Sequence, residues 1–186
     1  MKKVLKVFKV LFIALGILLA CIVLIFILGA GALSKANKEY ESNKVEVDSP
    51  NGDKKAFIIY QPAAKSDVVE KVTKGLSEGL SEQGYDVCID YCGKHISADL
   101  SEYDVVVYGG ATYAGHISTV LLDTVTKVTA YKDEANVFVF STGMMDTETE
   151  IDEVVKKANR SVQDTKKFKA SDKDISTQAK NWANNF

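Results

Sequence analysis

Hydrophobic and polar positions follow two different periods from residue 56 to the end of the chain. Short, nearly continuous apolar runs are typical of strands covered on both faces. These runs are 56–60, 85–90, 103–109 and 136–140. Elsewhere, apolar residues recur every three or four positions, which predicts amphipathic helices. The helical patterns cover 68–80, 117–128, 151–158 and 171–186. Strands alternating with helices predict an α/β domain over residues 56–186, with a mostly parallel sheet and helices on both faces.

A fifth strand has the weakest support in this pattern. Only Lys167-Phe168-Lys169-Ala170 offers itself, and its flanking lysines suit a short edge strand. The alternative is that helices between Asp146 and Phe186 pack without it. Ser171, followed by Asp174 three residues later, has the form of a capping box and predicts that the last helix begins at Ser171.

The N-terminal pattern is of another kind. Residues 10–33 form a stretch of 24 residues without a charged or strongly polar side chain. As a helix it would be about 36 Å long, enough to cross a hydrocarbon core of roughly 30 Å. We therefore expect a transmembrane anchor over 10–33, preceded by a basic tail over 1–9. Two alternatives stay open: a signal peptide cleaved near Ala30–Ala32, and a lipoprotein, because Leu18–Cys21 resembles a lipid-attachment box.

Charge around the anchor predicts its orientation. Four lysines precede the apolar stretch, whereas the lysines after it are diluted by glutamates. This bias places the N-terminus in the cytoplasm, so we expect a single-pass cell-membrane protein with an extracytoplasmic C-terminal domain. Residues 34–55 show no apolar period and are expected to be a polar linker.

Composition narrows the function classes. Four of the 23 basic side chains precede residue 34 and all 25 acidic ones follow it, so residues 34–186 carry a net charge of −6. Arg160 is the single arginine. An acidic domain with so little arginine argues against nucleic-acid binding. Two histidines and three cysteines, scattered along the chain, do not form a metal-binding pattern. Cys88 and Cys92 lie four residues apart, and the sequence leaves open whether they form a disulfide.

Ligands of open parallel sheets bind at the carboxyl ends of the strands, where the strand order reverses. Three loops are predicted to meet there: Gln61–Asp67, Gly109–Ser118 and Ser141–Thr147. No Ser-His-acid or Cys-His pairing emerges from the sequence, so no catalytic residue is assigned and an enzymatic activity stays open.

The loop after the third strand carries a family resemblance. The run from Tyr103 to Ile117, YDVVVYGGATYAGHI, resembles the corresponding run of flavodoxin-like domains, including the menaquinone-linked protoporphyrinogen oxidase group. The resemblance implies an open sheet of order 2-1-3-4-5 and a loop that flanks the isoalloxazine ring of FMN. The ring-side candidates are then Gly110, Ala111, Thr112, Tyr113, Ala114, Gly115, His116, Ser141, Thr142, Gly143 and Met144.

The loop after the first strand departs from the same family. Flavodoxin-like loops read S/T-x-T-G-x-T and hold the FMN phosphate at a helix N-terminus. Here the stretch is Pro62-Ala63-Ala64-Lys65-Ser66-Asp67, in which proline lacks an N–H and aspartate adds a negative charge. Ala63, Ala64, Lys65 and Ser66 remain the phosphate-side candidates, and we expect FMN to be held weakly or not at all.

Two functions follow from these observations. The first is FMN-related electron transfer by a membrane-anchored domain, with a quinone or a membrane redox protein as partner. The second is a binding or interaction module that keeps the fold and has lost FMN.

Overall fold

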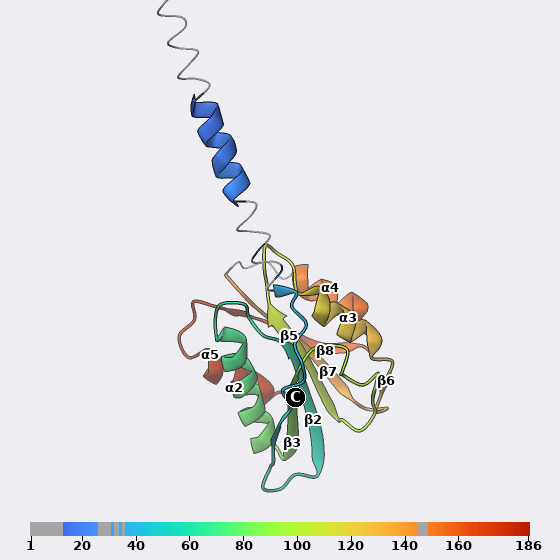
Figure 1. The fold of residues 1–186 in the computed structure, drawn as a ribbon. Coiled ribbons are helices and arrows are strands. Elements are labelled where there is room, and N and C mark those ends of the chain that lie inside the picture. Colours follow the sequence, from blue (N-terminus) through green and yellow to red (C-terminus); the bar gives the residue numbers. More distant parts are fainter. Residues whose placement is uncertain (1–12, 26–30, 32–33, 35, 145–148) are drawn as a thin grey trace, which may run out of the picture. The chain divides into compact units, whose positions relative to one another are not determined.

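The computed structural model describes residues 13–25, 31, 34, 36–144 and 149–186 of the 186-residue chain (Figure 1). The chain divides into two compact units, Met1–Lys35 and Ala36–Phe186. In the first unit, residues 13–25 are helical. Among the described residues, no helix has the length and apolar character that a membrane crossing requires. The predicted basic tail 1–9 and both ends of the predicted anchor lie outside the described residues.

The second unit is built on a six-stranded sheet in the order β1-β3-β2-β5-β7-β8. Its strands are β1 (Val45–Val47), β2 (Lys54–Gln61), β3 (Tyr85–Tyr91), β5 (Val105–Ala111), β7 (Asn136–Gly143) and β8 (Val162–Lys169). All neighbours are parallel except β1, which pairs antiparallel with β3. The five parallel strands thus have the order 2-1-3-4-5 that was predicted. A small second sheet pairs β4 (Asp99–Leu100) with β6 (Ala130–Tyr131).

Strand β8 confirms the predicted fifth strand and is longer than expected. Phe168 is its one fully buried residue, while most of the other positions are polar and partly exposed. An edge strand that buries so little has no continuous apolar run, which is why its sequence signal is short.

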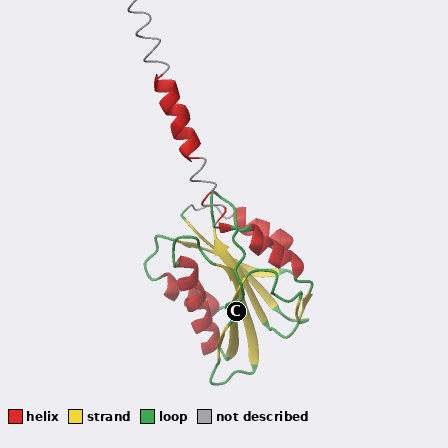
Figure 2. Ribbon diagram, viewed as in Figure 1, coloured by secondary structure: helices red, strands yellow, loops and turns green. Residues whose placement is uncertain are grey.

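Four helices cover the sheet, two on each face (Figures 1 and 2). They are α2 (Val68–Glu82) and α5 (Ile175–Ala183) on one face, and α3 (Thr119–Lys127) and α4 (Thr149–Lys157) on the other. Two glycines of α2 allow α5 to approach closely. A Cβ added at Gly75 would lie 2.1 Å from the carbonyl oxygen of Ser176, and one at Gly79 would lie 2.8 Å from that of Lys180.

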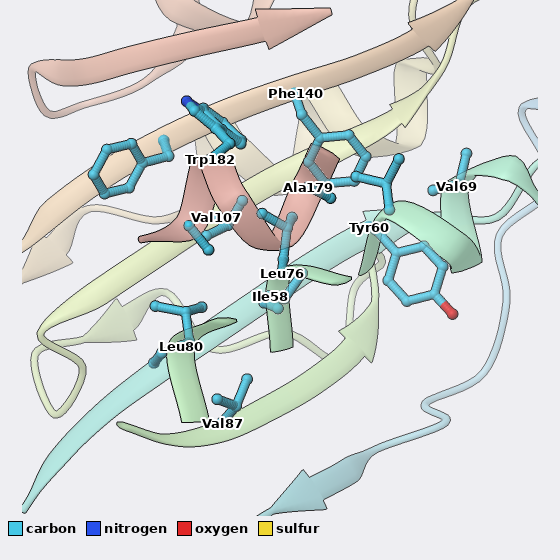
Figure 3. Packing of buried hydrophobic residues seen from close by; sticks show 14 of the residues in the cluster. Ile58, Tyr60, Val69, Leu76, Leu80, Val87, Val107, Phe140, Ala179 and Trp182 are labelled. Carbon is cyan, nitrogen blue, oxygen red and sulfur yellow. The ribbon is translucent and has the colours of Figure 1, made fainter. Parts of the chain in front are cut away.

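The core on the α2 side is drawn in Figure 3. Leu76 and Leu80 are fully buried and pack in one cluster with Ile58, Val107 and Trp182. Complete burial of such aliphatic side chains stabilises the fold by about 1.5–3 kcal/mol each. A second apolar cluster fills the space between the sheet and the α3–α4 face. The sheet is therefore covered on both sides, as its apolar strands predict.

The last helix begins at Ile175, so the predicted start at Ser171 is wrong. The backbone N–H of Asp172 binds the carbonyl of Lys169, which places Ser171 in a turn directly after β8. Asp174 is the N-cap residue, with a φ of 51° and no side-chain capping bond. The spacing of Ser171 and Asp174 matches a capping box only by coincidence, because Ser171 lies in the turn that follows the edge strand.

Residues 34–55 differ from the polar linker that the sequence predicts. Strand β1 pairs with β3 in the register Val45↔Ile89 and Val47↔Val87, and β2 begins at Lys54. A three-residue strand contains only two apolar positions, too few to show a period.

The segment before β1, residues 36–43, is also docked on the domain, and we call it the strap. The buried Gln61 side chain donates from Nε2 to the carbonyl oxygens of Ala36 (3.0 Å) and Lys38 (2.9 Å). Asn37 Oδ1 accepts the N–H of Thr119 at the start of α3, at 2.9 Å. The strap therefore ties the ends of two elements together.

The second half of the strap is held by Asp90, near the end of β3, and by Lys94, in the loop after it. Glu39 accepts the N–H of Lys94 at 3.0 Å and forms an ion pair with its ammonium group. Ser42 Oγ donates to Asp90 Oδ2 at 2.6 Å, and the Asn43 N–H to Asp90 Oδ1 at 2.7 Å.

Candidate functional site

The three loops of interest follow β2, β5 and β7 at the carboxyl edge of the sheet. The register pairs Gln61 with Gly110, and Ala111 with Thr142, so the three strands end side by side. Beyond the strand ends, the N–H of Thr112 donates to the carbonyl of Thr142 at 2.8 Å. The strand order reverses between β2 and β5, which is where this fold class binds ligands.

The loop after β5 is a two-residue hairpin. Tyr113 and His116 exchange both backbone hydrogen bonds, at 2.8 and 3.0 Å. The two central residues have positive φ, 51° at Ala114 and 82° at Gly115. This combination is a type I′ turn, which requires positive φ at both centres. The hairpin fixes the direction of the Tyr113 side chain.

Tyr113 reaches across to the loop after β2. Its ring packs against the α2-side core and its hydroxyl accepts the backbone N–H of Ala64 at 2.5 Å. Of the other phosphate-side residues, Ala63 is half-buried and packs on the same core, while Lys65 and Ser66 are exposed. Thus an amide that a bound phosphate would need is already used by the protein itself.

Charge at the start of α2 also disfavours an anion. Asp67 is the N-cap residue and makes no side-chain capping bond; its carboxylate forms an exposed ion pair with Lys71 at 3.0 Å. The hydrogen bond from Lys71 lowers the pKa of Asp67, so its carboxylate is charged at neutral pH. A negative group at this end suits the helix dipole. It repels a phosphate at the same place.

A buried ionic cluster lies under the ring-side loops. Glu150, in the first turn of α4, is fully buried, and its Oε1 accepts hydrogen bonds from Ser141 Oγ (2.9 Å), Thr112 Oγ1 (3.1 Å) and the ammonium group of Lys167. Burial would raise the pKa of Glu150, but the Lys167 bond and the other donors outweigh it, and the pKa is lowered. The second oxygen, Oε2, has no hydrogen-bond partner within the described part of the chain.

This cluster changes the interpretation of two ring-side candidates. The hydroxyls of Thr112 and Ser141 are engaged by Glu150 and point into the protein. Sequence reasoning missed Glu150 and Lys167, because an acid in the first helical turn and a lysine on an edge strand are both ordinary surface residues.

The remaining ring-side candidates line the open part of the edge. Met144 is 90% exposed, an unusual position for a large apolar side chain. The His116 ring is exposed, with Nδ1 3.4 Å from Glu153 Oε1. Gly143 lies close to neighbouring side chains: a Cβ there would be 3.4 Å from Lys167 Cε and from Thr112 Cβ.

Both cysteines of the domain are free thiols. Cys88 and Cys92 are buried, and the Cys92 thiol donates to Gln61 Oε1 at 2.8 Å. The sequence left open whether Cys88 and Cys92 form a disulfide, and in the described part of the chain they do not.

His95, Asp90 and Ser42 form a second cluster of polar side chains. His95 Nε2 lies 3.4 Å from Asp90 Oδ2, and Ser42 Oγ lies 2.6 Å from the same oxygen. Serine and histidine both contact the carboxylate, whereas a nucleophilic serine must contact the histidine. The cluster fastens the strap and has no triad geometry.

The two halves of the carboxyl edge differ in how well they fit FMN. The loop after β2 does not fit a phosphate, because Pro62 has no N–H, the Ala64 N–H is occupied, and Asp67 is negative. The ring side presents the exposed Met144 and a half-buried tyrosine, a surface that a planar aromatic ring can contact. Within the described residues, no group of histidine, cysteine or acidic side chains is arranged to hold a metal ion.

No family model and no curated protein matches the sequence. Among solved structures, the oxidised flavodoxin 2 of Bacillus cereus is 20% identical, with a TM-score of 0.54 over 69% of this chain and 94% of that one. The flavodoxin of Streptococcus pneumoniae TIGR4 is 16% identical, with a TM-score of 0.54 over 69% and 94%.

Larger proteins share the same fold over part of their length. The Flv1 flavodiiron core of Synechocystis is 15% identical, with a TM-score of 0.57 over 70% of this chain and 34% of that one. The chain thus spans about a third of the length of this flavodiiron protein. At these identities the likeness concerns the backbone alone, and it shows a flavodoxin-like fold over about 70% of this chain.

Proposed function

We propose that this chain is a membrane-tethered flavodoxin-like domain for FMN-related electron transfer, in which the flavin is recognised by its ring and weakly by its phosphate. The observation that carries the proposal is the meeting of the loops after β2, β5 and β7 at the edge where the strand order reverses between β2 and β5, the last two loops being joined by the Thr112–Thr142 hydrogen bond. This is the place where doubly wound sheets hold ligands.

The chain's own residues have simple roles in this proposal. Tyr113 and Met144 supply apolar contact area from two different loops. Gly110 allows the ends of β2 and β5 to pack closely, since a Cβ there would lie 3.3 Å from Gln61 Cβ. When bound, the flavin supplies the electron-transfer chemistry, and the protein supplies orientation and electrostatics.

Membrane attachment is part of the proposal and is supported by the sequence. Residues 10–33 are apolar and long enough to span a bilayer, and residues 1–9 are basic. We propose an extracytoplasmic domain whose partner is a quinone or a membrane redox protein. The net charge of −6 over residues 34–186 suits docking on a positive partner surface.

A second candidate function is an interaction module that has kept the fold and lost FMN. It is favoured by the contact of Tyr113 with the Ala64 N–H, and by the inward engagement of the Thr112 and Ser141 hydroxyls. Fold alone does not decide between the two candidates.

Electron transfer to a quinone tests the proposal. The full chain in detergent micelles is loaded with riboflavin, the flavin is reduced anaerobically with stoichiometric dithionite, and a quinone is then added while the visible flavin absorbance is followed. We expect the absorbance of the oxidised flavin to return faster with the chain than in micelles alone. Equal rates contradict the redox function, and absence of any riboflavin binding favours the interaction module.

A further inference from the structure

The side chain of Tyr113 occupies a position that another molecule would take in a phosphate-binding loop. Its hydroxyl oxygen lies 2.5 Å from the Ala64 nitrogen and accepts that N–H. A phosphate oxygen bound by this amide would have to lie at a similar distance and in the same space. The protein thus places an oxygen of its own where the anion would sit.

Two features hold the tyrosine there. The type I′ hairpin, with positive φ at Ala114 and Gly115, fixes the backbone on the C-terminal side of Tyr113. The ring packs against the buried cluster that includes Val69 of α2 and Phe140 of β7. A phosphate at the Ala64 amide would therefore have to break this hydrogen bond and move a hydroxyl that the ring contacts hold in place.

Few other groups at this loop could bind an incoming phosphate. The residue two positions before Ala64, Pro62, has no N–H to donate. Asp67 faces solvent with a lowered pKa and carries a negative charge at the start of α2. Lys65 is exposed and Lys71 is already paired with Asp67, so the positive charge at this loop is partly neutralised.

We propose that Tyr113 is a specificity-determining residue: its hydroxyl closes the loop after β2 to phosphate, so that the carboxyl edge accepts a flavin ring without selecting its phosphorylated form. The statement on flavin selection rests on the proposed function. The statement that Tyr113 closes the loop to anions stands independently of it.

The replacement Tyr113→Phe separates the hydroxyl from the ring. Phenylalanine keeps the apolar packing and frees the Ala64 N–H. Tyr85→Phe is a matched control, because Tyr85 is also a buried tyrosine and lies at the amino end of β3, away from the loops. Both variants and the unmodified chain are studied as full chains in detergent micelles.

The first measurement needs no flavin. Amide exchange at Ala64 is measured by NMR, and its resonance is followed during a titration with inorganic phosphate. We expect Tyr113→Phe to raise the exchange rate of the Ala64 amide about tenfold and to make its resonance respond to phosphate. The unmodified chain and Tyr85→Phe should show neither effect.

The second readout is the ratio of the dissociation constants for FMN and riboflavin, from quenching of flavin fluorescence. We expect the unmodified chain to bind the two flavins with constants within about threefold, and Tyr113→Phe to bind FMN about five- to tenfold more tightly with riboflavin unchanged.

The outcomes separate the two statements. Phosphate that shifts the Ala64 resonance in the unmodified chain overturns the proposal, as does a variant whose Ala64 exchange and flavin ratio equal those of the unmodified chain. If neither flavin binds while Tyr113→Phe still alters exchange and phosphate response, the proposed function fails and the assignment of Tyr113 as the closing residue holds.

Discussion

Glu150 and Lys167 form an ion pair in which both side chains are shielded from water, the acid completely and the lysine to all but 5% of its surface. They come from α4 and from the edge strand β8. The Glu150 carboxylate also accepts hydrogen bonds from the hydroxyls of Thr112 and Ser141. One charged group therefore links the ends of three strands to a helix. The pair therefore fixes the ring-side edge of the sheet.

Removing one partner of this pair should be costly. Lys167→Met leaves a buried carboxylate without its counter-charge, and we expect the free energy of unfolding to fall by about 3–5 kcal/mol. Urea denaturation followed by circular dichroism measures this loss. The double variant Glu150→Met with Lys167→Met should recover most of it, because no charge is then left unpaired.

The exposed Lys173 provides the control for charge removal alone. Lys173→Met should change the unfolding free energy by less than about 0.5 kcal/mol. A Lys167→Met variant as stable as this control would show that the buried pair does not form in solution.

Acid should weaken the same pair. The pKa of Glu150 is lowered in the folded state from an ordinary value of 4.5. A lowered folded-state pKa stabilises the fold above pH 4.5, and the contribution is lost as the pH falls through the folded-state value. We expect the unfolding midpoint of the unmodified chain to decrease as the pH is lowered below 4.5. This decrease should be steeper than that of the Glu150→Met/Lys167→Met variant. Parallel curves for the two proteins would contradict the assignment.

The strap should depend on Gln61. Gln61→Leu deprives the carbonyls of Ala36 and Lys38 of a donor and the Cys92 thiol of its acceptor. We expect a loss of about 2–3 kcal/mol in unfolding free energy.

Release of the strap has its own readout, since Lys38 is exposed and lies within it. Trypsin should cut after Lys38 faster in Gln61→Leu than in the unmodified chain. Gln178→Leu on α5 is the control and should leave the cutting rate unchanged. Equal rates in all three proteins would mean that the strap is held by its other contacts.

The sequence predicted the parts of the fold that depend on long, regular patterns. The runs that became β2, β3, β5 and β7 are buried on both faces, and such strands show in the sequence directly. The strap and β1 were missed because their attachment relies on single side chains, such as Gln61, from distant positions in the chain.

The candidate site was predictable as a meeting of loops and not as a set of contacts. Strand order and the carboxyl-edge rule placed Tyr113 near the loop after β2. That its hydroxyl would take the Ala64 N–H depends on the hairpin geometry at Ala114 and Gly115. Glu150 gave no signal, because an acidic residue in the first turn of a helix is ordinarily exposed on the surface.

Orientation in the membrane remains a prediction from the lysines of residues 1–9. Reporter fusions at Phe186 should score as extracytoplasmic. Replacing Lys2, Lys3, Lys6 and Lys9 by glutamine should reduce that score, because the charge bias is modest. A cytoplasmic score for the unmodified fusion would overturn the orientation.

The central claim is that this flavodoxin-like domain binds a flavin by its ring. Titration of the unmodified full chain with riboflavin, followed by fluorescence quenching, tests this most directly, because riboflavin has the ring and lacks the phosphate. The account predicts saturable riboflavin binding with a dissociation constant within about threefold of that for FMN. FMN bound about a hundredfold more tightly, or no saturable binding of either flavin, would contradict it.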